Sequence, residues 1–276
     1  MTKLMIFNQK GGVGKSTSVV NIAGCLSHHL KKRVLVIDVD GQTTCSTYLT
    51  TIAGPSAYSL YDYITEDMPI QDIITPIQFE RYDFRKRCQV PQKTLIDLIP
   101  SSRNFGKPSF FDYFQETDLF SKIFTEIENL KDAKYNYDYV IFDCPGYINK
   151  LTENVLCAVD YIIIPAIADM DSLVGFQDLV DTKNRIREES QNIGLEILGV
   201  FFTMFAGISV NRQIRQICTE QMGEDIIFNT IIRRASVILD ARVMGKPLAY
   251  HKPQDSVSED YLTLTKEIIK RIEQRK

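Results

Sequence analysis

The chain has 276 residues, of which 44% are hydrophobic and 24% charged; its formal net charge of −3 does not exclude a local basic surface for nucleic acid. No run approaches about 18 consecutive apolar residues, which excludes a membrane-spanning helix, and the start of the chain lacks the pattern of a signal peptide. Six scattered cysteines form no CxxC pair, so zinc and iron–sulfur spacings are absent and reduced thiols in a cytoplasm are expected.

Short apolar runs rich in β-branched residues alternate with amphipathic segments of helical length. The expected strands are Leu4–Asn8, Val34–Asp38, Leu95–Pro100, Tyr139–Asp143, Tyr161–Pro165, Leu198–Met204 and Ile226–Ile232. The expected helices are Lys15–Leu30, Leu119–Lys131, Thr152–Ala158, Leu173–Glu189, Val210–Met222 and Ser256–Arg275. Continuous apolar runs separated by helices indicate a doubly wound α/β fold, with a mostly parallel sheet covered on both faces and ligands at the carboxyl ends of the strands. Nothing resembles a linker, so a single domain over residues 1–276 is predicted.

One segment, Gln78–Lys93, departs from this pattern. Its charged and aromatic side chains are Phe79, Glu80, Arg81, Tyr82, Asp83, Phe84, Arg85, Lys86, Arg87 and Lys93. A charge run of this kind is usually a solvated surface excursion. The alternative interpretation is a contact surface for DNA or for a partner protein.

A glycine-rich loop stands between the first expected strand and the first expected helix. Its residues are Lys10, Gly11, Gly12, Val13, Gly14, Lys15, Ser16 and Thr17. Glycines let backbone N–H groups converge on phosphate oxygens, and the helix N-terminus adds a favourable dipole. The motif predicts that Lys15 reaches the β- and γ-phosphates and that the Ser16 hydroxyl binds Mg²⁺. The general P-loop has glycine where Gln9 stands, while Lys10 supplies an extra cation.

The run KGGVGKST resembles the deviant Walker A box of the ParA/Soj/MinD family of ATPases, in which the first lysine is the signature residue. The resemblance implies an ATPase that needs ATP and Mg²⁺, with Lys10 and Lys15 acting on the phosphates. It implies further that Lys10 crosses to the other subunit of a homodimer that encloses ATP. The sequence shows no obvious partner for Lys10 within its own subunit.

Two further segments are similar to the switch regions of this family. The first, Val36–Gln42, resembles the pattern DxDPQ, with Gly41 in place of proline, which is expected to loosen the loop. The resemblance implies that Asp40 orients the attacking water and that Asp38 supports hydrated Mg²⁺. The second, Asp143–Gly146, resembles DxPP with glycine at its last position. The resemblance implies that Asp143 is the Walker B-type carboxylate, which reaches the metal through water.

The C-terminal part continues the resemblance. Leu198–Met204 resembles the family's late strand, and Thr230–Ala235 with Gly245–Leu248 resembles the pattern TxIPRN…HGKPI. In the family, the proline and asparagine on either side of the arginine in this pattern, which corresponds to Arg234, help to hold adenine. Arg233 and Ala235 take their places here, so base contacts are expected from backbone and apolar surface. The expected adenine site comprises Met204, Ile232, Arg233 and Ala235.

The resemblance leaves several functions open, and DNA partitioning is favoured among them. In that case, an ATP-bound dimer binds nucleoid DNA without sequence preference, and a ParB-like centromere-binding partner triggers hydrolysis. Arg212 and Arg215 are three residues apart, which places them on one helix face, and Arg234 matches the family's DNA-contacting arginine. The sequence leaves three cargoes open: a plasmid, a chromosome or an integrated mobile element.

Two alternatives compete with DNA partitioning. A MinD-like membrane-bound positioning ATPase needs an exposed amphipathic tail, whereas the spacing of Val257, Tyr261, Leu264, Ile268 and Ile272 favours a packed helix face. No membrane contact is therefore expected. A metabolic or redox relative needs paired cysteines that bridge the dimer, and Cys144 and Cys157 lack that spacing.

Overall fold

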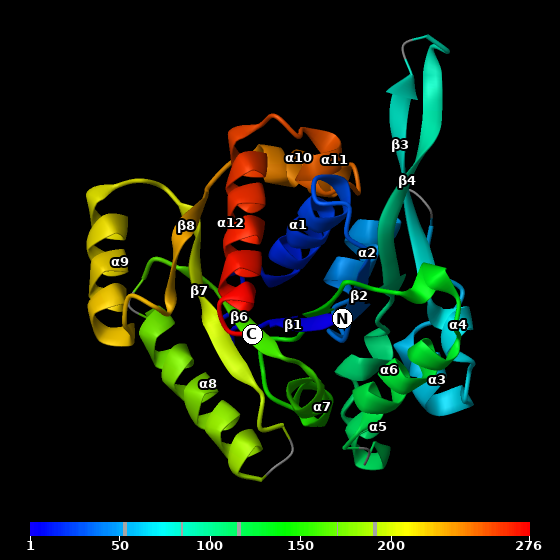
Figure 1. Cartoon of the computed structure of the whole chain (residues 1–276), viewed down its shortest axis with the longest axis horizontal. Coiled ribbons are helices and arrows are strands. Elements are labelled where there is room, and N and C mark those ends of the chain that lie inside the picture. Colours follow the sequence, from blue (N-terminus) through cyan, green and yellow to red (C-terminus); the bar gives the residue numbers. More distant parts are fainter. Residues whose placement is uncertain (52–53, 84, 115–116, 170, 190–191) are drawn as a thin grey trace.

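The computed structural model describes residues 1–51, 54–83, 85–114, 117–169, 171–189 and 192–276. Its strands form one eight-stranded sheet in the order β3-β4-β2-β5-β1-β6-β7-β8 (Figure 1). The strands are β1 (Thr2–Ile6), β2 (Val34–Asp38), β3 (Thr75–Asp83), β4 (Cys88–Ile99), β5 (Tyr139–Asp143), β6 (Tyr161–Ile167), β7 (Glu196–Phe205) and β8 (Ile227–Arg233). All neighbouring pairs are parallel except β3 and β4, which run antiparallel at one edge.

Helices cover both faces of this sheet. They are α1 (Lys15–His28), α2 (Thr44–Thr50), α3 (Leu60–Glu66), α4 (Ile70–Ile73), α5 (Pro108–Tyr113), α6 (Leu119–Asn129), α7 (Lys150–Ala158), α8 (Asp171–Glu188), α9 (Ser209–Met222), α10 (Val237–Val243), α11 (Leu248–His251) and α12 (Ser256–Glu273), with the short 3₁₀ turns η1 (Arg103–Gly106) and η2 (Ala133–Tyr135). The doubly wound α/β fold predicted from the alternation of apolar runs and helical segments is confirmed.

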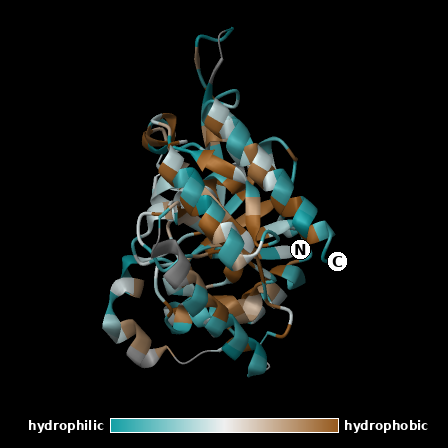
Figure 2. Cartoon of the chain, turned by 90° about the vertical axis from the view of Figure 1, so that its left-hand side faces the viewer, coloured by the Kyte–Doolittle hydropathy of each residue, from teal (hydrophilic) through white to brown (hydrophobic). Residues whose placement is uncertain are grey.

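The central strands are buried because they are apolar on both faces. Alternate residues of β1 belong to different clusters: Met5 packs in one, with side chains from α3 to α8, and Leu4 and Ile6 in the other, with α1, α2 and α10 to α12. Figure 2 shows the interior strands mostly in the hydrophobic colour, with hydrophilic residues on the outer helices. A strand buried on both faces reads as a continuous apolar run, which is why these strands were predictable.

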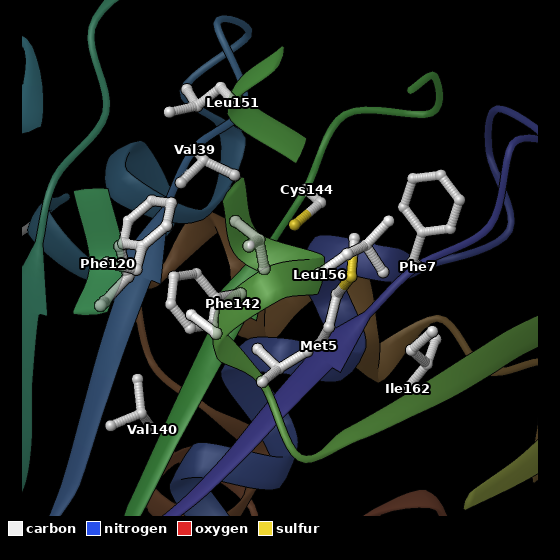
Figure 3. Close-up of a cluster of buried hydrophobic side chains, with 14 of the residues drawn as sticks. Met5, Phe7, Val39, Phe120, Val140, Phe142, Cys144, Leu151, Leu156 and Ile162 are labelled. Atoms are coloured by element: carbon white, nitrogen blue, oxygen red, sulfur yellow. The ribbon is translucent and has the colours of Figure 1, made fainter. Parts of the chain in front are cut away.

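Aromatic packing fixes the centre of the sheet. Phe142 of β5 meets Phe120 of α6 at a ring-centroid distance of 4.8 Å in an edge-to-face arrangement. Figure 3 shows Met5 and Phe142 on adjacent strands within this cluster. Through this cluster α6 packs on β5, which pairs with β1 up to the functional edge of the sheet.

The seven strands expected from the sequence all exist. Val34–Asp38 and Tyr139–Asp143 have the predicted bounds, and the other five differ at one or both ends. One strand, β3, was missed. Most of β3 and the first half of β4 fall within Gln78–Lys93, the segment interpreted as a surface excursion. That segment is a regular β-hairpin paired from Gln78 with Lys93 to Asp83 with Cys88. Phe84, one of the aromatic residues of the segment, lies outside the described residues.

Six helices were also missed, and they are mostly short. They are α2, α3, α4, α5, α10 and α11, each of four to seven residues. Helices this short carry too few turns for a hydrophobic period to emerge. By contrast, the packed face predicted for α12 is confirmed, because Val257, Tyr261, Leu264, Ile268 and Ile272 are all buried. Within the described residues, no helix is long and apolar enough to cross a membrane.

Candidate nucleotide site and arginine surface

The expected phosphate-binding residues lie at the carboxyl edge of the sheet. The loop Lys10–Thr17 connects β1 with α1, Asp38 ends β2 and Asp143 ends β5. In the register of the sheet, Ile6, Asp38 and Asp143 stand side by side on neighbouring strands. Three segments that are distant in the sequence are therefore brought together where an open α/β sheet binds ligands.

Hydrogen bonds to neighbouring strands hold the glycine-rich loop in shape. Gly14, at the N-cap of α1, has a φ of 87°, which a side chain would oppose. The hydroxyl of Thr203 in β7 donates to the Val13 carbonyl at 2.9 Å, and the Asn8 amide donates to the Pro165 carbonyl at 2.8 Å. These bonds tie the loop to β6 and β7, and the Lys10 N–H at its start donates to the Asn8 side chain at 2.8 Å.

Lys10 has a partner within its own chain, contrary to the sequence-based expectation. Its Nζ donates to the Asp169 carboxylate at 2.6 Å. Asp169 follows β6, the neighbour of β1 in the sheet, so the pairing arises from strand order. Both side chains are about one-third exposed, and an ion pair of this exposure contributes only about 0–1 kcal/mol to stability. The pair is therefore weak enough to exchange for another partner.

Lys15 sits deeper in the site. Its Nζ donates to the Lys10 carbonyl at 3.2 Å. Burial lowers the pKa of the Lys15 ammonium, while the negative charges of Asp143 and Asp40 act in the opposite direction. A lysine that is largely dehydrated and lies among carboxylates is suited to contact phosphate oxygens directly.

Asp38 and Asp143 are completely buried. Asp38 accepts hydrogen bonds from the backbone N–H of Asp40 (3.0 Å) and from the N–H and hydroxyl of Ser46 (2.8 and 2.7 Å). Burial raises the pKa of Asp38 to about 7, against these bonds, which favour its charged form. Burial and the charge of Asp38 raise the pKa of Asp143 well above its ordinary value, while Ser16 opposes the rise.

Both carboxylate oxygens of Asp143 are buried without a hydrogen-bond partner in the part of the chain that the structure describes. A buried unpaired carboxylate is costly and calls for a cation. No cluster of three or more His, Cys, Asp or Glu side chains suited to a metal occurs among the described residues. The donor set of Ser16, Asp38 and Asp143 fits Mg²⁺, which takes few protein ligands and completes its shell with water and phosphate.

The arginines expected to bind DNA lie in or beside one hollow. Its volume is about 450 Å³, and it is lined by Phe205, Arg212, Arg215, Gln216, Thr219 and Ile231. Arg212 is exposed, whereas Nη2 of Arg215 donates to the carbonyls of Phe228 and Asn229 in β8. Arg234 is exposed, and its backbone N–H donates to the Phe205 carbonyl at 3.2 Å. Arg212 and Arg234 therefore offer their charge to solvent, while Arg215 fastens α9 to β8.

Comparison with known proteins shows to which family the chain belongs. The sequence family described as "AAA domain" matches residues 1–197. The sporulation initiation inhibitor protein Soj of Bacillus subtilis is 31% identical over 273 residues, covering 96% of this chain and 97% of Soj. The chromosome partitioning protein ParA of Caulobacter vibrioides is 30% identical over 269 residues, covering 97% and 94%. The chain belongs to the ParA/Soj family of P-loop ATPases.

The fold agrees with this family. An ATP complex of a Cyanothece McdA variant superposes with a TM-score of 0.74 at 20% identity, covering 98% of this chain and 96% of McdA. The deviant P-loop of the ParA/Soj family, inferred above from KGGVGKST, therefore stands in its expected structural context, between a strand and a helix.

The two glycines that depart from the switch patterns of the ParA/Soj family lie at close approaches. A Cβ on Gly41 would lie 2.6 Å from the backbone nitrogen of Gly106, and one on Gly146 would lie 3.0 Å from the Gln9 carbonyl and 3.2 Å from the Lys15 ammonium. Gly41 was expected to loosen its loop. Instead, it lets η1 pack directly against the first switch, where the Ser101 hydroxyl donates to the Asp40 carbonyl.

The expected adenine site lies at the ends of β7 and β8. Met204 is exposed in a left-handed conformation (φ 52°), and Ala235 is half-buried. The side chain of Ile232 is buried in the core, so this position offers a ligand mainly its backbone. Arg233 forms a two-pronged ion pair with Asp260 of α12, both contacts at 2.7 Å. Arg233 thus braces β8 against α12 beside the surface that Met204 and Ala235 expose.

Four residues of the site were missed by sequence reasoning: Ser46, Ser101, Asp169 and Thr203. Ser46 bonds Asp38, Ser101 bonds the Asp40 carbonyl, Asp169 pairs with Lys10 and Thr203 supports the phosphate loop. Each is a polar residue at or just beyond the end of a strand or at the start of a helix on the carboxyl edge. A search for polar residues at strand ends could have found Asp169 and Thr203.

Gly41→Ala is expected to destabilise the protein and to slow ATP turnover. The new Cβ would meet backbone atoms of η1, which cannot move aside cheaply, so we expect a loss of about 1–3 kcal/mol in the free energy of unfolding. Urea unfolding measures it. Gly194→Ala is the control, since its Cβ would have no neighbour closer than 3.8 Å. Equal stability of Gly41→Ala and wild type would contradict this packing.

Without nucleotide or Mg²⁺, Asp38 should make stability fall as pH rises. Its pKa is about 7 in the folded chain and near 3.8 when unfolded, so between these values the folded state binds more protons. The stabilising contribution is complete below about pH 4 and lost through about pH 7, at up to about 1.4 kcal/mol per pH unit. Urea unfolding of wild type and Asp38→Asn across this range measures it. Parallel curves for the two proteins would contradict the raised pKa.

Proposed function

We propose that this chain is a DNA-partition ATPase. It binds ATP with Mg²⁺, forms a homodimer around the nucleotide, binds DNA without sequence preference, and hydrolyses ATP when a ParB-like partner engages it. It would act in the cytoplasm on the nucleoid, as a single domain of 276 residues. The observation that carries the proposal is the placement of Lys10, a second lysine on the phosphate loop, in a partly exposed ion pair with Asp169.

The names of the relatives support this proposal. The Caulobacter relative is a chromosome partitioning protein, and the Bacillus relative is Soj; each aligns with almost the whole chain. The McdA structure of the same fold contains ATP. A partitioning role with ATP as ligand is therefore consistent with sequence, fold and the chemistry of the site.

The side chains and backbone groups of the site suit a nucleoside triphosphate. Backbone N–H groups of Gly11–Gly14 and the N-terminus of α1 would surround the phosphates, and Lys15 would neutralise the charge nearest the bond that breaks. Ser16, Asp38 and Asp143 would hold Mg²⁺, which supplies positive charge on the phosphate oxygens. Binding the cation also gives the buried oxygens of Asp143 the partner that they lack among the described residues.

Two residues are assigned to the hydrolytic step. Asp40 is partly exposed in the first switch, and its carboxylate accepts from the Gln42 N–H at 2.9 Å, which restrains its orientation. From this place it would position the attacking water. Lys10 would leave Asp169 and neutralise phosphate charge in the other subunit. Exchanging one carboxylate for a triphosphate favours the dimer, because the new partner carries more negative charge.

DNA would be bound by the exposed cations near the hollow beside α9. Arg212 and Arg234 can contact backbone phosphates, which carry no sequence information. Arg215, since it is bonded to β8 carbonyls, would support this surface more than contact DNA. The membrane-bound alternative gains no support from α12, whose apolar residues are buried against the body of the protein.

The dimer and the hydrolytic role can be tested in one series. Asp40→Ala should bind Mg²⁺ and ATP and dimerise, while its turnover falls by about 10²-fold or more, because a water-positioning group acts in the transition state. Adding Lys10→Ala should return this variant to a monomer in light scattering. Asp169→Asn, which removes only the charge of the internal partner of Lys10, is the control and should still dimerise. Dimerisation of the Lys10→Ala variant equal to that of its parent would refute the proposed contact across the dimer.

DNA binding should respond to the exposed arginines and to nucleotide. Arg212→Ala/Arg234→Ala should weaken ATP-dependent binding of all duplexes alike and reduce the salt slope by about one unit for each phosphate that is no longer neutralised. Arg215→Ala should in addition lower the free energy of unfolding, because it removes bonds to β8. Filter binding across a salt series measures the slopes. Unchanged slopes in the double variant, or ATP-dependent binding to anionic liposomes in place of DNA, would overturn the assignment.

A further inference from the structure

The hairpin formed by β3 and β4 projects from the body of the protein. β4 pairs with β2 only over Ile96–Ile99, so within the described part of the chain its first half pairs with β3 alone. Figure 1 shows the two strands extending well beyond the helices. We call residues 78–93 the hairpin arm. Its six paired rows span about 20 Å at the rise of an antiparallel strand.

The base of the arm is fixed, so that the arm points in a defined direction. Phe79 is buried with its ring 4.9 Å from that of Tyr250 in α11. The Lys246 ammonium donates to the Glu80 carbonyl, and the Leu95 N–H bonds the Ser27 hydroxyl of α1. These contacts anchor the lower part of the arm to α1 and α11. The residues beyond the pair of Glu80 and Pro91 extend outward from that anchor.

The charge of the arm is opposite to that of the chain. It carries five basic and two acidic side chains, while the whole protein has a net charge of −3. Arg81 and Lys93 are exposed on opposite faces of the ribbon. Arg81 pairs with Val90 and Lys93 with Gln78, three positions further along, and successive positions of a strand alternate between its two faces. Arg85, Lys86 and Arg87 are exposed at the turn. Positive charge thus covers both faces and the tip.

We infer that the hairpin arm is a second site for double-stranded DNA, inserted as a ribbon into a groove. The major groove is about 12 Å wide and admits a two-stranded β-ribbon, with phosphates on either side of it. Cations on both faces and at the tip match that surrounding charge. A protein partner docked on one face would use the cations of that face alone and would need apolar anchors at its centre.

This site does not depend on the proposed nucleotide switch. The turn of the arm joins the amino end of β4, which runs parallel to β2, whereas Asp38 and the phosphate loop lie at the carboxyl ends of the strands. The arm therefore projects from the amino-terminal edge of the sheet, opposite the edge at which the nucleotide would bind. Its contribution to DNA binding is present with ADP as well as with ATP.

The test is a salt titration of binding to a 30-base-pair duplex, using the full chain with Mg²⁺ and ADP. The tip variant is Arg85→Ser/Lys86→Ser/Arg87→Asn, with asparagine at the last position because Arg87 has a φ of 51°. Its slope of log K against log salt should be smaller than that of wild type by about two to three units. Lys266→Ser/Lys270→Ser/Lys276→Ser removes three other exposed charges and should leave the slope nearly unchanged. Equal slopes for the tip variant and wild type would overturn the site.

A direct contact is tested through Cys88, the exposed thiol at the row next to the turn. A photo-crosslinker on Cys88, in a Cys157→Ser background, should attach to the duplex with either nucleotide. One on Lys131→Cys, in a Cys88→Ser/Cys157→Ser background, should not. Displacement of the duplex by an equal charge of polyglutamate would show a site for acidic protein segments and overturn the DNA assignment. The proposed function fails separately, if ATP adds no binding beyond that seen with ADP.

Discussion

Two carboxylates are buried side by side where the central strands end, and the rest of the site is arranged around them. Asp38 and Asp143 occupy matching positions on β2 and β5 and are inaccessible to solvent. Burial raises the pKa of both carboxyls, and the negative charge of Asp38 adds to the rise at Asp143. Ser46 steadies Asp38, while the oxygens of Asp143 have no partner among the described groups. The folded chain therefore carries an electrostatic cost that a bound cation relieves.

The surrounding groups make that relief specific for a nucleotide. Lys15 of the P-loop interacts electrostatically with Asp143 and Asp40. Positive and negative charges are therefore close together in the buried part of the site. Thr203 and Asn8 fix the loop above the sheet. Lys10, at the rim, forms a partly exposed ion pair with Asp169. Strong interactions thus lie at the bottom of the site and weak ones at its mouth, where another molecule can compete for them.

Much of this was accessible from the sequence, and the exceptions have physical causes. The parallel strands were predictable because burial on both faces requires continuous apolar runs, and the phosphate loop because its glycines and Lys15 have a fixed spacing. β3 was missed because only Ile77 and Phe79 are buried along its described part. They alternate with exposed Pro76, Gln78 and Glu80, and a charged sequence follows them. Asp169 and Thr203 could be listed as polar residues near strand ends, but which of these residues contacts the loop depends on strand order, which no local pattern encodes. The need for Gly41 likewise depends on where η1 packs.

The most direct test of this account is the proton balance of nucleotide binding. Calorimetric titration of ATP at about pH 6.5, with Mg²⁺ in excess and in buffers of different ionisation enthalpy, counts the protons exchanged. Because carboxyls with raised pKa values must ionise to meet the cation, the account predicts net proton release that is reduced in Asp38→Asn. Binding of ATP with Mg²⁺ without proton release, or with the same release in Asp38→Asn, would contradict it.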